Sequence, residues 1–147
     1  MKKTLLCLSA LLAFSASANN FESADDAIHY RQSAFGLIAY QFGDMSAMLK
    51  GKKEFNADVF AQRAENVAAL AKLPAEGFIA GSDKGNTEAL AKIWENQADF
   101  DSRMGEFREN AAKLAIAAKG TDKDAIKAAF MNTGKSCKGC HDNYKKD

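Results

Sequence analysis

The sequence has 147 residues, 27% charged and 47% hydrophobic, a balance that is typical of one globular domain and excludes a disordered or collagen-like chain. The formal net charge of +1 is too small to indicate a nucleic-acid-binding protein. A single proline, ten glycines and few β-branched residues favour helices over an all-β fold.

The first eighteen residues are typical of a secretory signal peptide. A basic start (1–3) precedes an apolar run over 5–14, and small residues at 16–18 stand where a signal peptidase cleaves. The run has about half of the roughly 20 apolar residues that a membrane span needs, so we expect no membrane insertion. Cleavage after Ala18 would change the formal net charge from +1 to −1 and leave a single domain over 19–147 in the periplasm.

The first two predicted helices cover residues 23–49 and 56–72. In the first, steps of four and three residues place eight side chains on one stripe, which is apolar except for one arginine. These residues are Ala24, Ile28, Arg31, Phe35, Ile38, Phe42, Met45 and Leu49. The second helix stops before Pro74, because proline disfavours a helical conformation in the residue before it.

Two more helices are predicted after a long break. Residues 75–86 are Gly-rich and polar, which predicts a loop. The third helix covers 87–118 and ends at Gly120. Thr121 with Asp124 resembles a capping box, so the fourth helix is predicted from there to the carboxyl end. Short joins and one apolar stripe per helix predict an all-α fold, an antiparallel up-down-up-down four-helix bundle.

One motif carries chemistry, the sequence Cys137-Lys138-Gly139-Cys140-His141. Two cysteines three residues apart, followed at once by histidine, indicate c-type haem attachment. Residues i, i+3 and i+4 share one face of a helix. Two thioether bonds can therefore hold one haem c while His141 is the metal ligand. The apolar stripe through Phe130 continues to the motif, so the haem is expected inside the bundle.

Other interpretations of the motif explain less. A zinc site normally has four ligands, and the only other histidine is His29. A thioredoxin-type pair requires a βαβ context, which the helical pattern does not offer. A structural disulfide between Cys137 and Cys140 leaves His141 unexplained. Covalent haem agrees with both the motif and the export signal.

The sixth iron ligand separates a gas-binding protein from an electron carrier. An aromatic ring at Phe35, on the inward stripe, can cover the iron but cannot bind it. Met104 is the candidate ligand that helical position excludes least well. The other candidates lie too far along a helix or on the wrong side of one. They are Met45, Met48, Met131 and His29. We therefore predict no protein ligand on the distal side.

Arg31 is the one charged residue on the apolar stripe of the first helix. It can lie at the helix edge with its aliphatic stem buried and its charge in water. Alternatively, its guanidinium pairs with a haem propionate, since a partly buried charge needs a partner, and Gln32 can donate to the same group. Trp94 is interpreted as core or haem-edge packing.

Four helices, a carboxyl-terminal CxxCH and the segment Tyr30-Arg31-Gln32-Ser33-Ala34 together resemble the cytochrome c′ family over the whole mature chain. The resemblance implies a five-coordinate, high-spin haem iron bound through His141 and anchored by Cys137 and Cys140. It also implies binding of nitric oxide and carbon monoxide, and a homodimer through the first two helices.

The resemblance also implies roles for residues outside the motif. By position, Arg31 and Gln32 would contact a propionate and Phe35 would shield the distal face. Ser82 and Asp83 match a loop that lies near the haem in the family. The shield is often leucine, so the bulkier Phe35 should restrict distal ligands. In addition, Lys145 stands where some members have arginine on the proximal side.

The predicted protein is a periplasmic c-type cytochrome rather than an enzyme. Its haem iron has an open coordination position that binds nitric oxide and carbon monoxide. No hydrogen-bond donor for oxygen is evident near Phe35, so these two gases should be favoured. The alternative is a low-spin electron carrier of the cytochrome c556 type with a methionine sixth ligand. A helical partner-binding protein without haem is a third possibility. Further expected partners are a redox protein and a second copy of the chain, in contact through Leu37, Phe55 or Ala61.

Overall fold

The computed structural model describes residues 21–146, so the predicted signal peptide and its cleavage site lie outside the described residues. The helices are α1 (Ala24–Leu49), α2 (Ala57–Leu70), η1 (Pro74–Gly77), α3 (Lys92–Glu95), α4 (Gln97–Ala117) and α5 (Lys123–Tyr144). None of the described helices has both the length and the apolar character that a membrane crossing needs.

The long helices begin at polar side chains that cap free backbone N–H groups. Ser23 accepts from the backbone N–H of Asp26 (3.1 Å) and opens α1 where the sequence predicts. At α5 the predicted capping box is wrong by one residue. Asp122, not Thr121, is the cap, and its carboxylate accepts from the N–H groups of Asp124 (3.0 Å) and Ala125 (3.1 Å).

The predicted third helix over 87–118 is wrong at its amino end, where the structure has an irregular segment and then two helices, α3 and α4. The N–H of Leu90 donates to the carbonyl of Tyr144 (2.9 Å), and the N–H of Lys146 donates to the carbonyl of Glu88 (2.8 Å). These bonds give the backbone of residues 88–90 partners on the carboxyl-terminal segment. Distant pairing thus overrides the local helix propensity.

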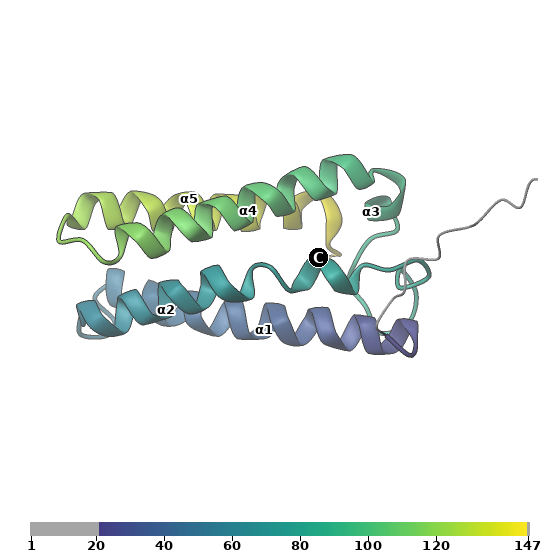
Figure 1. Cartoon of the computed structure of the whole chain (residues 1–147), viewed down its shortest axis with the longest axis horizontal. Coiled ribbons are helices and arrows are strands. Elements are labelled where there is room, and N and C mark those ends of the chain that lie inside the picture. Colours follow the sequence, from purple (N-terminus) through teal and green to yellow (C-terminus); the bar gives the residue numbers. More distant parts are fainter. Residues whose placement is uncertain (1–20, 147) are drawn as a thin grey trace, which may run out of the picture.

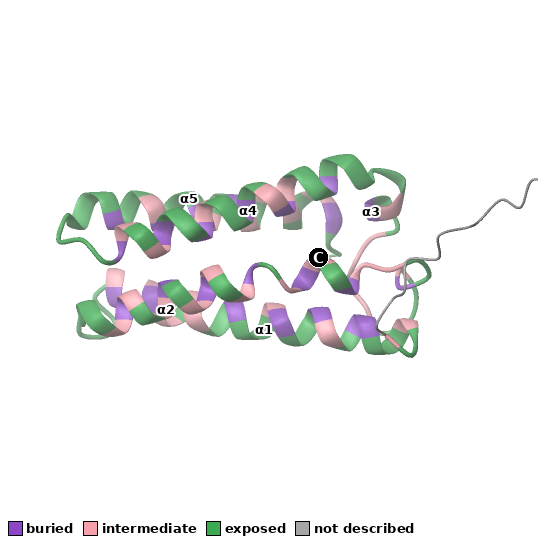
Figure 2. Cartoon of the chain, in the orientation of Figure 1, coloured by how far each residue is buried: buried purple, intermediate pink, exposed green. Residues whose placement is uncertain are grey.

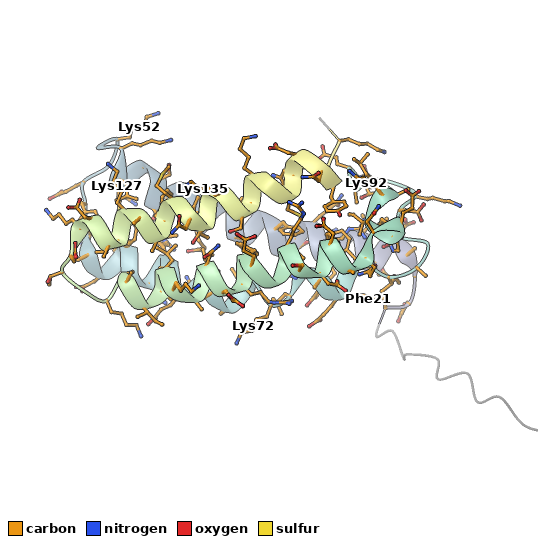
Figure 3. The ribbon with its side chains drawn as sticks, turned by 90° about the horizontal axis from the view of Figure 1, so that it is seen from above. Phe21, Lys52, Lys72, Lys92, Lys127 and Lys135 are labelled. Carbon is orange, nitrogen blue, oxygen red and sulfur yellow. The ribbon has the colours of Figure 1, made fainter. Side chains whose placement is uncertain are left out.

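The four long helices form an antiparallel bundle, as predicted. Figure 1 shows α1 beside α2 and α4 beside α5, with successive long helices running in opposite directions. Helix α1 packs against α2, α2 against α4, and α4 against α5, while η1 packs on α1. Lys127 and Lys135 project from the outer face of α5 (Figure 3).

The interior holds two groups of buried apolar side chains. Figure 2 marks the buried positions along the helices in purple. The larger group is centred on Phe60, Val67, Phe107 and Leu114. Phe130 of α5 belongs to this group, and its ring stacks on that of Phe42 of α1 with the ring centroids 4.1 Å apart. The smaller group, which we call the α4–α5 cluster, consists of Ile93, Phe100, Met104 and Tyr144.

Candidate functional site

A cavity of about 650 Å³ lies between α1 and α5, with further walls from α4 and from residues 87–89. Its volume is within the range of about 300–1,000 Å³ that is usual for small-molecule and cofactor sites. The largest part of its wall is apolar and aromatic. These residues are Phe35, Ile38, Phe42, Phe78, Ile93, Phe100, Met104 and Phe107. Such a cavity suits a large, mostly apolar group with a few polar ends.

The CxxCH motif lies on the last turns of α5, and Cys137, Cys140 and His141 all line the cavity. Helical spacing explains this, since residues three and four apart share a face. Both cysteines are free thiols and half-buried. No group of three or more His, Cys, Asp or Glu side chains in residues 21–146 is arranged to hold a metal ion. The motif therefore presents two thiols and one imidazole to a cavity of cofactor size.

Burial also sets the protonation of these three side chains. It raises the pKa of Cys137 to about 11. It likewise raises the pKa of Cys140, against an opposing effect of Arg103. Both groups are thiols at neutral pH, unlike the thiolates of reactive redox pairs. Burial lowers the pKa of His141, so its imidazole is neutral at pH 7, the form that binds metals.

Arg31 is buried, with 2% of its surface exposed, and it holds the loop that follows η1. Its Nη1 donates to the carbonyl of Gly77 (2.8 Å) and to the hydroxyl of Ser82 (2.6 Å). Its Nη2 donates to the carbonyl of Ser82 (2.7 Å) and to the hydroxyl of Thr87 (2.8 Å). No carboxylate in the described chain lies within ion-pair distance of it. It is thus a buried cation on the cavity wall without an anionic partner.

The structure brings Gln32 and Phe35 to the cavity but not Ser82 or Asp83. The Gln32 amide is exposed and donates to the carbonyl of Asn86 (2.9 Å). Phe35 is half-buried on α1, and its ring meets that of Phe78 edge-on at 6.4 Å. Ser82 is fully buried and reaches the site only through Arg31, while Asp83 is not part of the cavity wall.

Sequence reasoning missed the tight contact that positions this loop. A Cβ atom at Gly77 would lie 2.6 Å from the carbonyl oxygen of Ala27 and 2.8 Å from Cβ of Arg31. Only glycine therefore lets η1 approach α1 closely enough for the Arg31 hydrogen bonds. The spacing of Pro74 and Gly77 is the sequence feature that could have predicted the short helix η1 at this contact.

Of the candidate sixth ligands, only Met104 lines the cavity in the described chain. Met45 and Met48 belong to the larger core group, whereas Met131 and His29 are exposed. Met104 is 3% exposed and lies in the α4–α5 cluster with Tyr144, three residues after His141.

Replacing Arg31 with methionine should lower the free energy of unfolding by roughly 2–4 kcal/mol, because several buried oxygen atoms lose their charged donor. Urea unfolding of the haem-loaded protein, followed by circular dichroism, measures the loss. Arg108→Met is the matched control at an exposed position and should change stability by less than about 0.5 kcal/mol. Equal losses in the two variants would contradict a loop-holding role.

Comparisons with known proteins agree with this geometry. The family model described as Cytochrome C′ matches residues 26–145. Cytochrome c′ of Rubrivivax gelatinosus is 46% identical over 126 residues, which cover 85% of this chain and 98% of that protein. The solved cytochrome c prime of Shewanella frigidimarina is 73% identical, with a TM-score of 0.86, over 87% of this chain and 100% of that one.

A third similar protein is cytochrome c prime from Alcaligenes xylosoxidans. A nitric oxide complex of a leucine-to-alanine variant of it is 38% identical, with a TM-score of 0.80, over 86% of this chain and 98% of that one. A carbon monoxide-bound leucine-to-glycine variant of the same protein matches with the same identity and TM-score, over 86% of this chain and 99% of that one.

Proposed function

The chain belongs to the cytochrome c′ family, and from this premise we propose that it is a periplasmic, high-spin cytochrome whose five-coordinate haem iron binds nitric oxide and carbon monoxide on its open distal side. Members of the family carry covalently attached haem c, and Cys137 and Cys140 are present for the attachment. When bound, the haem supplies an iron atom that ligates diatomic gases. The family is one of haem-binding, electron- or gas-binding proteins, and we propose no enzymatic reaction for this chain.

The observation that carries the proposal is the pairing of two unlike walls across one cavity. The α5 wall presents the thiols and the imidazole of His141, and the α1 wall presents the benzyl group of Phe35. A benzyl group excludes water but cannot coordinate iron. Nitric oxide and carbon monoxide complexes of cytochrome c prime from Alcaligenes xylosoxidans support the same ligand class here.

The position of Met104 bears on whether the distal side is open. Helix α4, which carries Met104, packs directly against α5, and Met104 contacts the cluster that contains Tyr144 of α5. Met104 therefore shares a cluster with Tyr144, three residues after His141, and Phe35 of α1 packs against the same cluster. Because Met104 still lines the cavity, a low-spin electron carrier with Met104 as the sixth ligand is the alternative function.

We propose that Arg31 and Gln32 face the haem propionates. Arg31 is a buried cation without a carboxylate partner in the described chain, and an uncompensated buried charge is costly. A propionate would supply the missing negative charge. Burial lowers the pKa of Arg31, but a guanidinium titrates so far above neutral pH that it remains charged. Gln32 lies at the exposed edge of the same wall.

We also propose that the protein forms a homodimer through its first two helices. Leu37 of α1 and Phe55 before α2 are exposed by 53% and 39%, and Ala61 is half-buried. The exposed side chains of Leu37 and Phe55 are apolar surface that a second copy of the chain would cover. A monomeric mass in sedimentation velocity at micromolar concentration would exclude this contact.

The absorption spectrum of the haem-loaded protein tests the function. We expect a high-spin ferrous spectrum that changes when carbon monoxide is added, both in the unaltered protein and in Met104→Leu. Two results together would establish the electron carrier instead. They are a low-spin spectrum that carbon monoxide does not change, and a high-spin spectrum in Met104→Leu. A protein from a haem-competent host without a Soret band would contradict both functions.

A further inference from the structure

A polar cluster of Asp99, Arg103 and Tyr144 joins α4 to α5, beside the turns of α5 that carry the CxxCH motif. Nε of Arg103 lies 2.6 Å from Oδ2 of Asp99, and the hydroxyl of Tyr144 donates to the same oxygen at 2.5 Å. Nη1 of Arg103 also donates to the carbonyl of Gly139 (3.0 Å), the residue before Cys140. The cluster therefore attaches the backbone of the CxxCH motif to α4.

The ion pair within this cluster has a direction relative to the cavity. Arg103 lines the cavity wall, whereas Asp99 does not, and the side chain of Asp99 is 52% exposed. The positive end of the pair thus faces the cavity, and the negative end faces solvent. The ion pair between Lys145 and Glu88 differs, because both of its members line the cavity and their charges cancel there.

The surroundings of the pair keep both charges in place. The hydrogen bond from Arg103 lowers the pKa of Asp99, and the hydrogen bond to Asp99 raises the pKa of Arg103. Tyr144 is 4% exposed and packs edge-on against Phe100 at 5.6 Å, which fixes its hydroxyl. The orientation of the pair is therefore a constant feature of the fold around neutral pH.

We propose that the Arg103–Asp99 pair raises the reduction potential of the haem, through the positive charge that Arg103 presents to the cavity. The inference rests on the haem binding described under the proposed function. Reduction adds one electron to the iron and lowers its charge by one. A nearby cation repels the more positive oxidised state more strongly and so favours the reduced state. Hydrogen bonding and charge around an iron site are recognised determinants of its potential.

Two single variants test the sign of the effect. Arg103→Gln leaves the negative charge of Asp99 alone and should lower the reduction potential. Asp99→Asn leaves the positive charge of Arg103 alone and should raise it. The potentials are measured by spectroelectrochemistry with mediators, in about 0.1 M salt, where charges interact over about 10 Å. Arg103→Lys keeps the charge and should retain a potential close to that of the unaltered protein.

The same helix offers a matched control pair. Lys113 and Glu109 form an exposed i,i+4 pair at 3.9 Å, ten residues or about 15 Å further along α4. Lys113→Gln and Glu109→Gln repeat the two charge changes there and should shift the potential much less. Tyr144→Phe removes one hydrogen bond without a charge change, and its shift should be smaller than that of either Asp99→Asn or Arg103→Gln.

A merely structural role would give a different pattern. Loosening of α5 from α4 would admit water, which stabilises the more charged oxidised state, so both variants would lower the potential. Shifts of the same sign in Asp99→Asn and Arg103→Gln, or shifts no larger than in the controls, would overturn the inference. The Soret band of each variant reports haem binding separately, so failure of the proposed function is visible on its own.

Discussion

A chain in which serine replaces both Cys137 and Cys140 is expected to lose covalent haem completely. Neither serine can form a thioether, so haem extracts into acidified organic solvent and no haem stain remains with the polypeptide on a denaturing gel. Haem without a thioether can leave, and the cavity of about 650 Å³ then lacks the group that its apolar wall suits. Large unfilled apolar cavities are strongly destabilising. We expect a loss of more than about 3 kcal/mol, or a fall in melting temperature of about 10 °C.

The residue between the cysteines provides the control for this experiment. Lys138 is exposed and pairs with Asp142 on the surface of α5, so Lys138→Gln keeps the spacing of the motif and should keep all its haem. Single cysteine variants should retain haem through the remaining thioether. Covalent haem in the double variant would show that attachment does not use these thiols.

The second large effect is expected at Phe35, where alanine should speed carbon monoxide association by roughly ten- to a hundredfold. An incoming ligand must move the ring away from Phe78, a contact at 6.4 Å that is worth about 0.5–1.5 kcal/mol beyond simple burial. Removing the ring eliminates both the Phe78 contact and the burial of the ring from the activation free energy of association. Each 1.4 kcal/mol removed speeds association about tenfold. Stopped-flow mixing of the reduced protein with carbon monoxide measures the rate.

Phe42→Ala is the matched control for Phe35→Ala. Phe42 lines the same cavity from the same helix, seven residues or about 10 Å further on, but stacks on Phe130. Its loss should reduce stability and change the association rate by less than about twofold. A rate in Phe35→Ala equal to that of the unaltered protein would remove Phe35 from the path of the ligand.

What sequence reasoning predicts well here depends on local geometry. The stripe on α1 and the motif on α5 follow from helical spacing alone, because residues three and four apart share a face. Arg31, Phe35, Cys137, Cys140 and His141 accordingly line one cavity. The family resemblance predicted from the motif and the α1 segment is confirmed by the family match over residues 26–145.

What it predicts badly depends on pairing between distant residues. Arg31 bonds to residues 46 to 56 positions away, which no periodic pattern indicates. The segment 88–90 is not helical because its backbone groups form hydrogen bonds with residues of the carboxyl-terminal segment. Arg103 and Asp99 have the ordinary i,i+4 spacing of a surface pair, and only the fold reveals that one end of the pair faces the cavity.

The backbone pairing between residues 88–90 and 144–146 has a practical consequence for producing the protein. Four residues of this pairing also line the cavity: Glu88, Ala89, Tyr144 and Lys145. A change that separates residues 88–90 from residues 144–146 would therefore also move part of the cavity wall. Recombinant protein intended for ligand-binding work should therefore keep the backbone pairing of residues 144–146 undisturbed.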